Sequence, residues 1–218
     1  TLGAAPLGIA GALYISEIAP GWVRELVKPG VEVLAGIPSI VYGFIGFTII
    51  NPYVSDELST GFGTLLAIGA VIGLMALPTV VSVAEDAIST VPESMKSGSL
   101  AMGATDGQTM KGVTIPAAFS GVSAAVLLGI GRAMGETMAA TVMIAHAQEL
   151  PQPLYDVFDS TETLTTLIAG NFGPAVGTTN YLSALFAAGV VLFLIVTGLS
   201  ILSQRIEDRM KRKLGGEQ

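Results

Sequence analysis

Long apolar stretches without a charged residue dominate this chain. About 20 apolar residues cross a bilayer as a helix, so each such stretch predicts a membrane span. The uncharged run 163–204 is too long for one crossing, and its polar and turn-forming residues from Asn171 to Asn180 predict a turn outside the membrane. We therefore expect about five spans, near residues 1–19, 31–52, 64–84, 117–147 and 181–203.

The composition agrees with a membrane protein. Apolar residues make up 51% of the 218 residues, charged residues only 12%, and the mean hydropathy is +0.68, whereas soluble domains carry about 25% charge. The predicted fold class is an all-α, polytopic transmembrane helical bundle that forms a single domain over residues 1–218. Without Cys, and with His146 as the single His, we expect no metal site and no cofactor.

Basic residues predict the orientation of the spans. The proposed inside regions 20–30, 84–115 and 204–218 hold all but one of the 10 Lys and Arg residues, and the proposed outside loops 51–63 and 149–180 hold none. Cytoplasmic loops carry the excess of Lys and Arg, so we expect a cytoplasmic C-terminus. Because the chain opens with Thr1 inside an apolar stretch, we also expect a fragment without its natural N-terminus.

Two charged residues lie within the fourth expected span. Burying a charge at mid-bilayer depth costs roughly 2.5–3.5 kcal/mol, so such residues usually face a water-filled path. A continuous helix would place Arg132 and Glu136, at spacing i, i+4, on one face. Gly129, Gly131 and Gly135 thin the same helix, and a guanidinium binds oxyanions in a bidentate manner. The pattern favours a transport path for an anion, and the alternative is a buried pair that only fixes helix packing.

The second expected span is interrupted at Pro38 and Ser39. Proline in a transmembrane helix leaves a carbonyl without its usual donor, and such breaks often line cavities. Ser39 is therefore a candidate for the transport path, although a simple packing kink would give the same pattern.

The segment 85–116 is too polar to cross a bilayer and too long for a simple turn. Pro92 and Glu93 suit the start of a short helix, and Gly103 suits its end. The run 105–108 then suits the capped start of a second helix. We expect a cytoplasmic helix–turn–helix, with a solvated connector as the alternative.

Three stretches together resemble a known family. Gly103 followed by Val113, Ile115 and Pro116 matches the spacing of the cytoplasmic coupling loop in permeases of ATP-binding cassette (ABC) importers. The stretches LAGIPSIVYGF (34–44) and GRAMGETMA (131–139) look like the phosphate-specific, PstC-like permeases. The resemblance covers nearly the whole chain from residue 6. It departs from the family at residues 96–101, where the expected acidic residue is absent, and the contacts of that residue are left open.

The resemblance implies a permease subunit that moves inorganic phosphate into the cytoplasm by alternating access, in the cell membrane of a prokaryote. It places Arg132 and Glu136 on the transport path, and we also expect Thr137 and Ser39 on the substrate path. Because the Glu136 carboxylate would repel phosphate directly, we expect it to hold Arg132 when no substrate is present. The residues expected to couple to the ATPase are Leu100, Ala101, Gly103, Thr105, Asp106, Gly107, Gln108 and Pro116.

The implied partners are a cytoplasmic ATP-binding subunit, an extracytoplasmic phosphate-binding protein, a second permease subunit and the lipid bilayer, with no nucleic acid. The sequence has no Gly-x-x-x-x-Gly-Lys-Ser/Thr phosphate loop, so we expect ATP hydrolysis on a separate subunit. One Arg against one Glu leaves no net positive field for a dianion, which favours further cations from a second permease.

Three alternatives stay open. The cargo could be molybdate, tungstate or sulfate, although Thr137-Met138-Ala139 favours phosphate because those relatives more often carry Phe-Gly there. An ion-coupled secondary transporter or channel would work without an ATPase, and the coupling-like loop disfavours it. The third alternative is a membrane-embedded enzyme, and no nucleophile–base or metal constellation in the sequence supports it.

Overall fold

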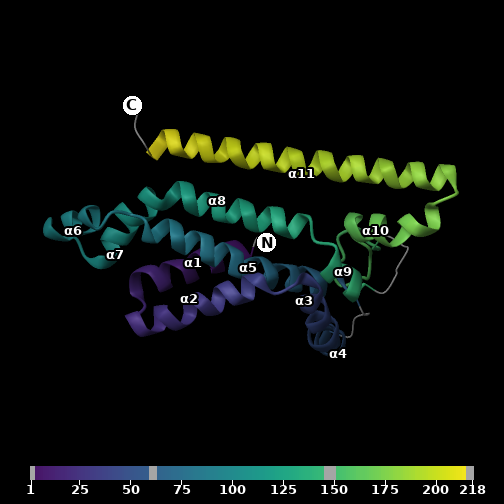
Figure 1. Cartoon of the computed structure of the whole chain (residues 1–218), viewed down its shortest axis with the longest axis horizontal. Helices are drawn as coiled ribbons and strands as arrows, with labels where there is room; N and C mark the ends of the chain where they lie inside the picture. The colour runs from purple at the N-terminus through teal and green to yellow at the C-terminus, as the bar shows by residue number, and fades with distance from the viewer. Residues whose placement is uncertain (1–2, 59–62, 145–150, 215–218) are drawn as a thin grey trace. The chain divides into compact units, whose positions relative to one another are not determined.

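The computed structural model describes residues 3–58, 63–144 and 151–214, and His146 lies outside these ranges. The all-α fold class is confirmed, because the described residues form helices and contain no named strand, only an isolated bridge between Thr64 and Ser160. The elements in chain order are α1 (Ala4–Leu13), η1 (Tyr14–Ile18), α2 (Gly21–Gly36), α3 (Ser39–Ile45), η2 (Gly46–Ile50), α4 (Asn51–Leu58), α5 (Leu65–Ser89), α6 (Glu93–Ala101), α7 (Asp106–Thr109), η3 (Met110–Thr114), α8 (Ile115–Met134), α9 (Met138–Met143), α10 (Leu164–Ala175) and α11 (Thr179–Leu214) (Figure 1).

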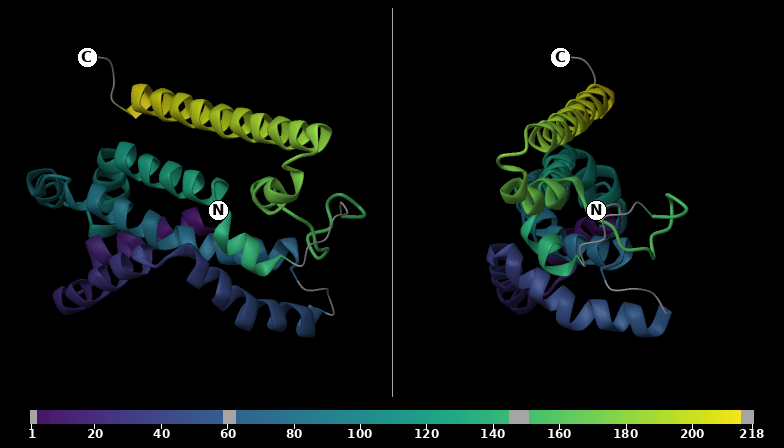
Figure 2. Two further views of the ribbon diagram at one scale, coloured as in Figure 1. Left: turned by 45° about the vertical axis from the view of Figure 1, so that its right-hand side comes forward. Right: turned by 90° about the vertical axis from the view of Figure 1, so that its right-hand side faces the viewer.

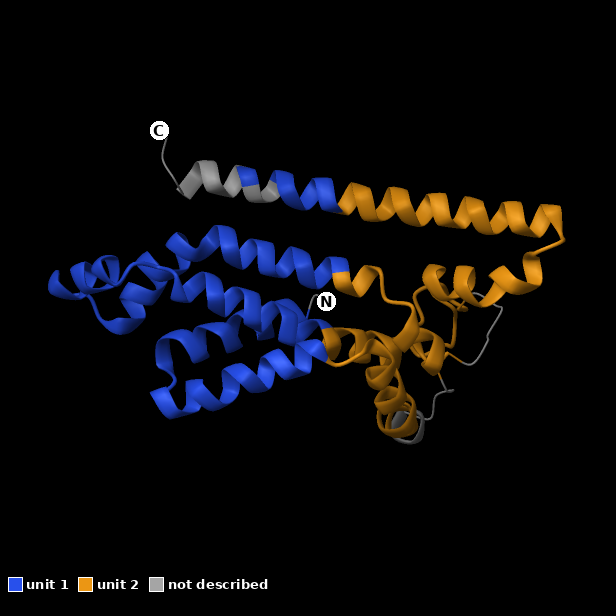
Figure 3. Cartoon of the chain, viewed as in Figure 1, with its two compact units in different colours: residues 1–36, 76–131, 200–218 blue, residues 37–75, 132–199 orange. Residues whose placement is uncertain are grey.

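The chain divides into two compact units. Unit 1 comprises residues 1–36, 76–131 and 200–218, and unit 2 comprises residues 37–75 and 132–199 (Figure 3). Both units are assembled from segments far apart in the sequence. Each is described below by itself.

Unit 1 is held together by close packing of small residues. Its core consists of alanines and β-branched residues from α1, α5 and α8, among them Ala12, Val80 and Ala125. A Cβ added to Gly8 on α1 would lie 2.8 Å from Val80 Cγ1, and one added to Gly129 on α8 would lie 2.5 Å from Val80 Cγ2. The glycines therefore let α1 and α8 approach α5, beside which α8 runs in all three views (Figure 1, Figure 2). Small residues at such contacts are typical of helices packed within membranes.

Unit 2 has a second core of the same kind. Ala67, Ile68 and Val71 of α5 pack against Ala139 and Met143 of α9. Backbone hydrogen bonds fix the N-terminal end of α5 to the loop 151–163, since the N–H groups of residues 65 and 66 donate to the carbonyls of residues 159 and 157. The loop thus caps the helix end.

Several helices have the length and composition of membrane spans. These are Leu65–Ser89, Asp106–Met134 and Thr179–Arg205, and the pair Gly21–Gly36 and Ser39–Val54 passes the same test as a broken span bent by 94°. The expected interruption at Pro38 is therefore confirmed, because α2 ends at Gly36 and α3 begins at Ser39. The five-span arrangement stays a prediction.

One local expectation is wrong. The polar run from Asn171 to Asn180 was expected to be a turn, but α10 continues to Ala175 and the turn is confined to residues 176–178. Pro174 is tolerated because it lies in the last turn of α10, and Gly177 supplies the reversal with a φ of +96°.

Candidate functional site

The helical path is broken at residues 135–137, directly after the turn that carries Arg132 and at Glu136 itself. α8 ends at Met134 and α9 begins at Met138, so the expectation of one continuous helix through Arg132 and Glu136 is wrong. The Glu136 carboxylate accepts a hydrogen bond from the N–H of Ala139 at 2.9 Å, across the start of α9. It therefore acts as a cap for the backbone of the second helix.

The carbonyl groups at the break also have partners. The Thr165 hydroxyl, on α10, donates to the Glu136 carbonyl at 2.8 Å. The Thr137 carbonyl accepts from both the N–H and the hydroxyl of Thr141, each at 2.8 Å. Non-helical backbone at membrane depth needs such partners because lipid offers none. The carbonyl groups of the break are thus satisfied by α10 and by the first turn of α9 itself.

Arg132 lies on the last turn of α8, immediately before the break, and is half-buried. Its positive charge also sits at a helix C-terminus, where the helix dipole favours a cation. The arrangement places a guanidinium directly before a helix break in unit 2.

α3 packs directly against α9 at glycine positions. A Cβ on Gly43 would lie 2.7 Å from Ala139 Cα, and a Cβ on Gly46 would lie 2.6 Å from Met143 Sδ. Ser39 is the first residue of α3, one turn before Gly43, and is half-buried. The structure thus brings the helix that begins with Ser39 against the helix that follows Glu136 and Thr137.

The expected helix–turn–helix is confirmed as a local structure, and its cytoplasmic location stays a prediction. α6 follows Pro92, and Gly103 ends the turn after it with a φ of +88°. Thr105 begins the second helix with a capping box, in which its hydroxyl accepts from the N–H of Gln108 and the Gln108 side chain accepts from the N–H of Thr105. This second helix runs on as one helix, Asp106–Met134, through α7, η3 and α8.

The residues proposed for ATPase coupling share a surface location, with one exception. Seven of them are exposed, namely Leu100, Ala101, Gly103, Thr105, Asp106, Gly107 and Gln108. Pro116 is half-buried in the first turn of α8 and does not belong to this exposed run. Met102, which sequence reasoning did not select, is 89% exposed at the end of α6. An exposed methionine beside Leu100 gives the turn an apolar tip.

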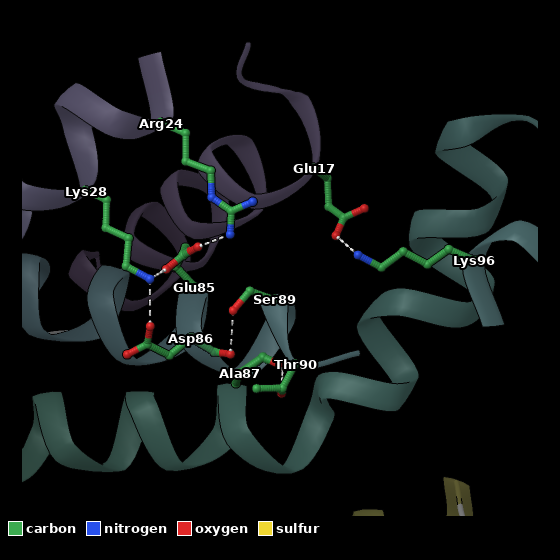
Figure 4. Close-up of polar contacts among 9 residues, drawn as sticks. All are labelled: Glu17, Arg24, Lys28, Glu85, Asp86, Ala87, Ser89, Thr90 and Lys96. Carbon is green, nitrogen blue, oxygen red and sulfur yellow. Dashed lines mark hydrogen bonds and ion pairs between the residues drawn. The ribbon is translucent and has the colours of Figure 1, made fainter. Parts of the chain in front are cut away.

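Ion pairs join helices of unit 1 to one another (Figure 4). The buried Glu85 of α5 lies between two cations of α2, since Arg24 donates to its Oε1 at 2.8 Å and Lys28 Nζ lies close to its Oε2. Lys28 also contacts Asp86 at 2.9 Å. The fourth pair joins Lys96 of α6 to Glu17 of η1 at 2.6 Å, with both side chains largely buried (Figure 4).

Sequence reasoning missed Thr165 and the Glu17–Lys96 pair. Thr165 lies in a threonine-rich run without a motif, and the two members of the pair are 79 positions apart. Such contacts have no local signal, so only the folded arrangement reveals them.

The helices of membrane-spanning length and the exposed helix–turn–helix are compatible with a polytopic membrane subunit, and comparison with known proteins shows its family. Residues 4–212 match the family described as binding-protein-dependent transport system inner membrane component. The chain belongs to this family and is a membrane-embedded permease subunit of an ABC importer.

Relatives with curated descriptions extend the match over nearly the whole chain. The probable ABC transporter permease protein YqgH of Bacillus subtilis is 42% identical over 95% of this chain and 67% of its own length. The phosphate transport system permease protein PstC of Xylella fastidiosa is 33% identical over 97% of this chain and 70% of its own length. PstC of Haemophilus influenzae has the same identity over 97% of this chain and 72% of its own length. The resemblance to PstC-like permeases is therefore confirmed.

Solved structures share the fold. An inward-facing structure of the MetNI methionine ABC transporter matches with a TM-score of 0.72 and 18% identity, over 96% of this chain and 88% of that chain. A crystal structure of an amino acid ABC transporter with histidines matches with a TM-score of 0.55 and 15% identity, over 96% and 86% of the two chains. At this identity the likeness concerns the fold alone.

Proposed function

We propose that this permease subunit carries inorganic phosphate across the membrane into the cytoplasm. The observation that carries the proposal is Arg132, a fixed cation that directly precedes a helix break in an apolar helix. The relatives described as phosphate transport permeases, at 33% identity over 97% of the chain, support this cargo over other oxyanions.

The chemistry of the guanidinium fits a tetrahedral oxyanion. Arginine stays charged when partly dehydrated and offers a planar fork of donors that matches two phosphate oxygens. The charge would be costly in an apolar helix without a hydrated path or an anionic partner, roughly 2.5–3.5 kcal/mol. A phosphate ion that passes the break would meet this guanidinium. Thr137 and Ser39 are the hydroxyl groups proposed to share this path.

Glu136 takes a positioning role in this proposal. Its carboxylate holds the N–H of Ala139, so it fixes the start of α9 and the shape of the break. A carboxylate placed this way is directed at a backbone donor at the start of α9. The role differs from that of a partner that neutralises Arg132 between transport cycles.

Energy for transport would come from a separate cytoplasmic ATP-binding subunit. The exposed turn 100–108, with its apolar tip at Met102, is the surface proposed to dock on that subunit. An extracytoplasmic phosphate-binding protein would deliver the anion, and a second permease subunit would complete the path. The C-terminus would then lie in the cytoplasm, in agreement with the basic residues after position 204.

The test is uptake of labelled phosphate into vesicles that contain this chain together with the subunits encoded beside it. We expect uptake that requires ATP and the binding protein and that is not competed by a large excess of molybdate, tungstate or sulfate. Uptake of one of those anions in preference to phosphate would overturn the cargo. Uptake without ATP would overturn the mechanism and favour an ion-coupled carrier.

A further inference from the structure

Polar contacts, and not the burial of apolar side chains, attach α6 to the rest of unit 1. The helix has no buried residue. Lys96 and Ser99 are its half-buried residues, and the remainder of α6 is exposed. These same two residues make its side-chain contacts to other elements in the described part of unit 1: Lys96 to Glu17, and Ser99 to Thr109.

The two contacts lead to different places. The Ser99 hydroxyl accepts from the Thr109 hydroxyl at 2.9 Å, and this bond joins α6 to α7 across the Gly103 turn. The Lys96–Glu17 pair reaches outside the helix–turn–helix, to η1 at the end of the first helix. This ion pair is therefore a direct side-chain contact between α6 and the end of the first helix.

The pair differs from its neighbours in burial. The side chains of Glu17 and Lys96 are 16% and 15% exposed, whereas those of Lys28 and Asp86 are 33% and 62% exposed. Charges screened from water interact more strongly, and removing one partner of a buried pair is far more harmful than removing one of an exposed pair. The Lys28–Asp86 contact is thus a natural control within the same unit.

A pocket of about 440 Å³ borders the pair. Its lining includes Glu17 and Lys96 together with Leu100, Asp106 and Gly107, three of the residues proposed for ATPase coupling. Close packing would resist motion of α6, whereas this space leaves α6 movable with the ion pair as its link to η1.

We propose that Glu17 and Lys96 are a positioning pair that transmits movement of the coupling helix to the first helix of the permease. This inference rests on the proposed ATP-driven transport. η1 is followed at once by α2, which leads to the break before Ser39. The pair thus connects the docking surface to the chain segment that enters the proposed substrate path. Lys96 also opens the stretch in which the sequence departs from the family pattern.

The experiment compares Lys96→Gln and Glu17→Gln with Asp86→Asn in the reconstituted complex. Phosphate uptake and ATP hydrolysis are measured together, per assembled complex, and expressed as phosphate moved per ATP. We expect each variant of the pair to lower this ratio about tenfold, as befits loss of a buried charge pair, while Asp86→Asn keeps the wild-type ratio. A purely structural role would lower the amount of complex and both rates alike, and would leave the ratio unchanged.

A second experiment exchanges the two charges and measures the same ratio of phosphate moved per ATP. Glu17→Lys combined with Lys96→Glu should restore most of the ratio, because the attraction is re-formed with opposite polarity. Should a single variant fail to assemble, the double change to Gln at both positions leaves no lone buried charge and should still show the lowered ratio.

An unchanged ratio in both the single and double Gln variants, while the wild-type complex imports phosphate with ATP, would overturn the pair's role and leave the proposed function standing. If the wild-type complex moves another oxyanion instead, the proposed cargo fails, and the same ratio measured with that anion still tests the pair.

Discussion

The described carboxylates of the two units show different kinds of partner. In unit 1 carboxylates face cations: Glu17 faces Lys96, and Glu85 faces Arg24 and Lys28. In unit 2 the Glu136 carboxylate is bound to a backbone N–H, and Arg132 stands at the end of the preceding helix. Paired charges fix helices to one another. A carboxylate bound to a backbone N–H shapes a helix break, whereas a carboxylate bound to a cation joins two helices. This difference separates the part proposed for coupling from the proposed substrate path.

The largest structural effect is expected at Gly43, where α3 and α9 touch. A Cβ there would lie 2.7 Å from Ala139 Cα and 2.8 Å from the Ala139 carbonyl, and backbone atoms cannot rotate away. Gly43→Ala should lower the free energy of unfolding by about 1–3 kcal/mol. Gly69→Ala, in α5 with open space around it, is the matched control. Equal unfolding midpoints for the two purified variants would show that the break is not held by this contact.

A smaller effect is expected at the coupling turn. Gly103 has a φ of +88°, a conformation that costs an L-residue roughly 1–2 kcal/mol. If the turn must keep this shape to dock, Gly103→Ala should weaken binding of the ATP-binding subunit by about 5- to 30-fold. Titration of the detergent-solubilised permease with that subunit measures the change. Gly98→Ala, within α6 and in open space, should bind normally. Normal binding of the ATP-binding subunit by both variants would show that the shape of this turn is not needed for docking and that the loop is only a connector.

The smallest effect distinguishes the two roles considered for Glu136. If the carboxylate serves as a cap for Ala139, Glu136→Ala should cost about 1 kcal/mol of stability, whereas Glu136→Gln keeps an acceptor oxygen and should cost only a few tenths. The unfolding midpoints of the two variants give the comparison. Equal and large losses for Gln and Ala would mean that the negative charge matters, and the pairing with Arg132 would be restored as the explanation.

The sequence predicted those features whose signals are local. Pro92, Gly103 and the capping run 105–108 defined the helix–turn–helix, and Pro38 defined the break between α2 and α3. Each of these residues restricts its own backbone or satisfies its own helix end, so no tertiary contact is needed to recognise it.

The sequence did not predict the break at residues 135–137, because the break has no local signal. The apolar run continues through it, and the contacts that hold it come from Thr165 on α10 and from α3. The end of α10, residues 171–175, was mistaken for a turn because its asparagine, glycine and proline residues are turn formers. The capping box that starts α10 has Thr166 at the position where Glu or Gln is usual, so it gave no clear signal in the sequence.

The most direct test of this account is the dependence of phosphate uptake on the side chain at position 132. Arg132→Ala and Arg132→Lys are compared with wild type in ATP-driven uptake, at matched amounts of assembled complex, with Arg205→Ala as a control at an exposed basic residue. We expect Ala to lower uptake by about 100-fold, through loss of charge-assisted hydrogen bonds, Lys to restore only a small part because it lacks the fork of donors, and Arg205→Ala to transport normally. Wild-type phosphate uptake by Arg132→Ala would contradict the assignment of the substrate path to the helix break in unit 2.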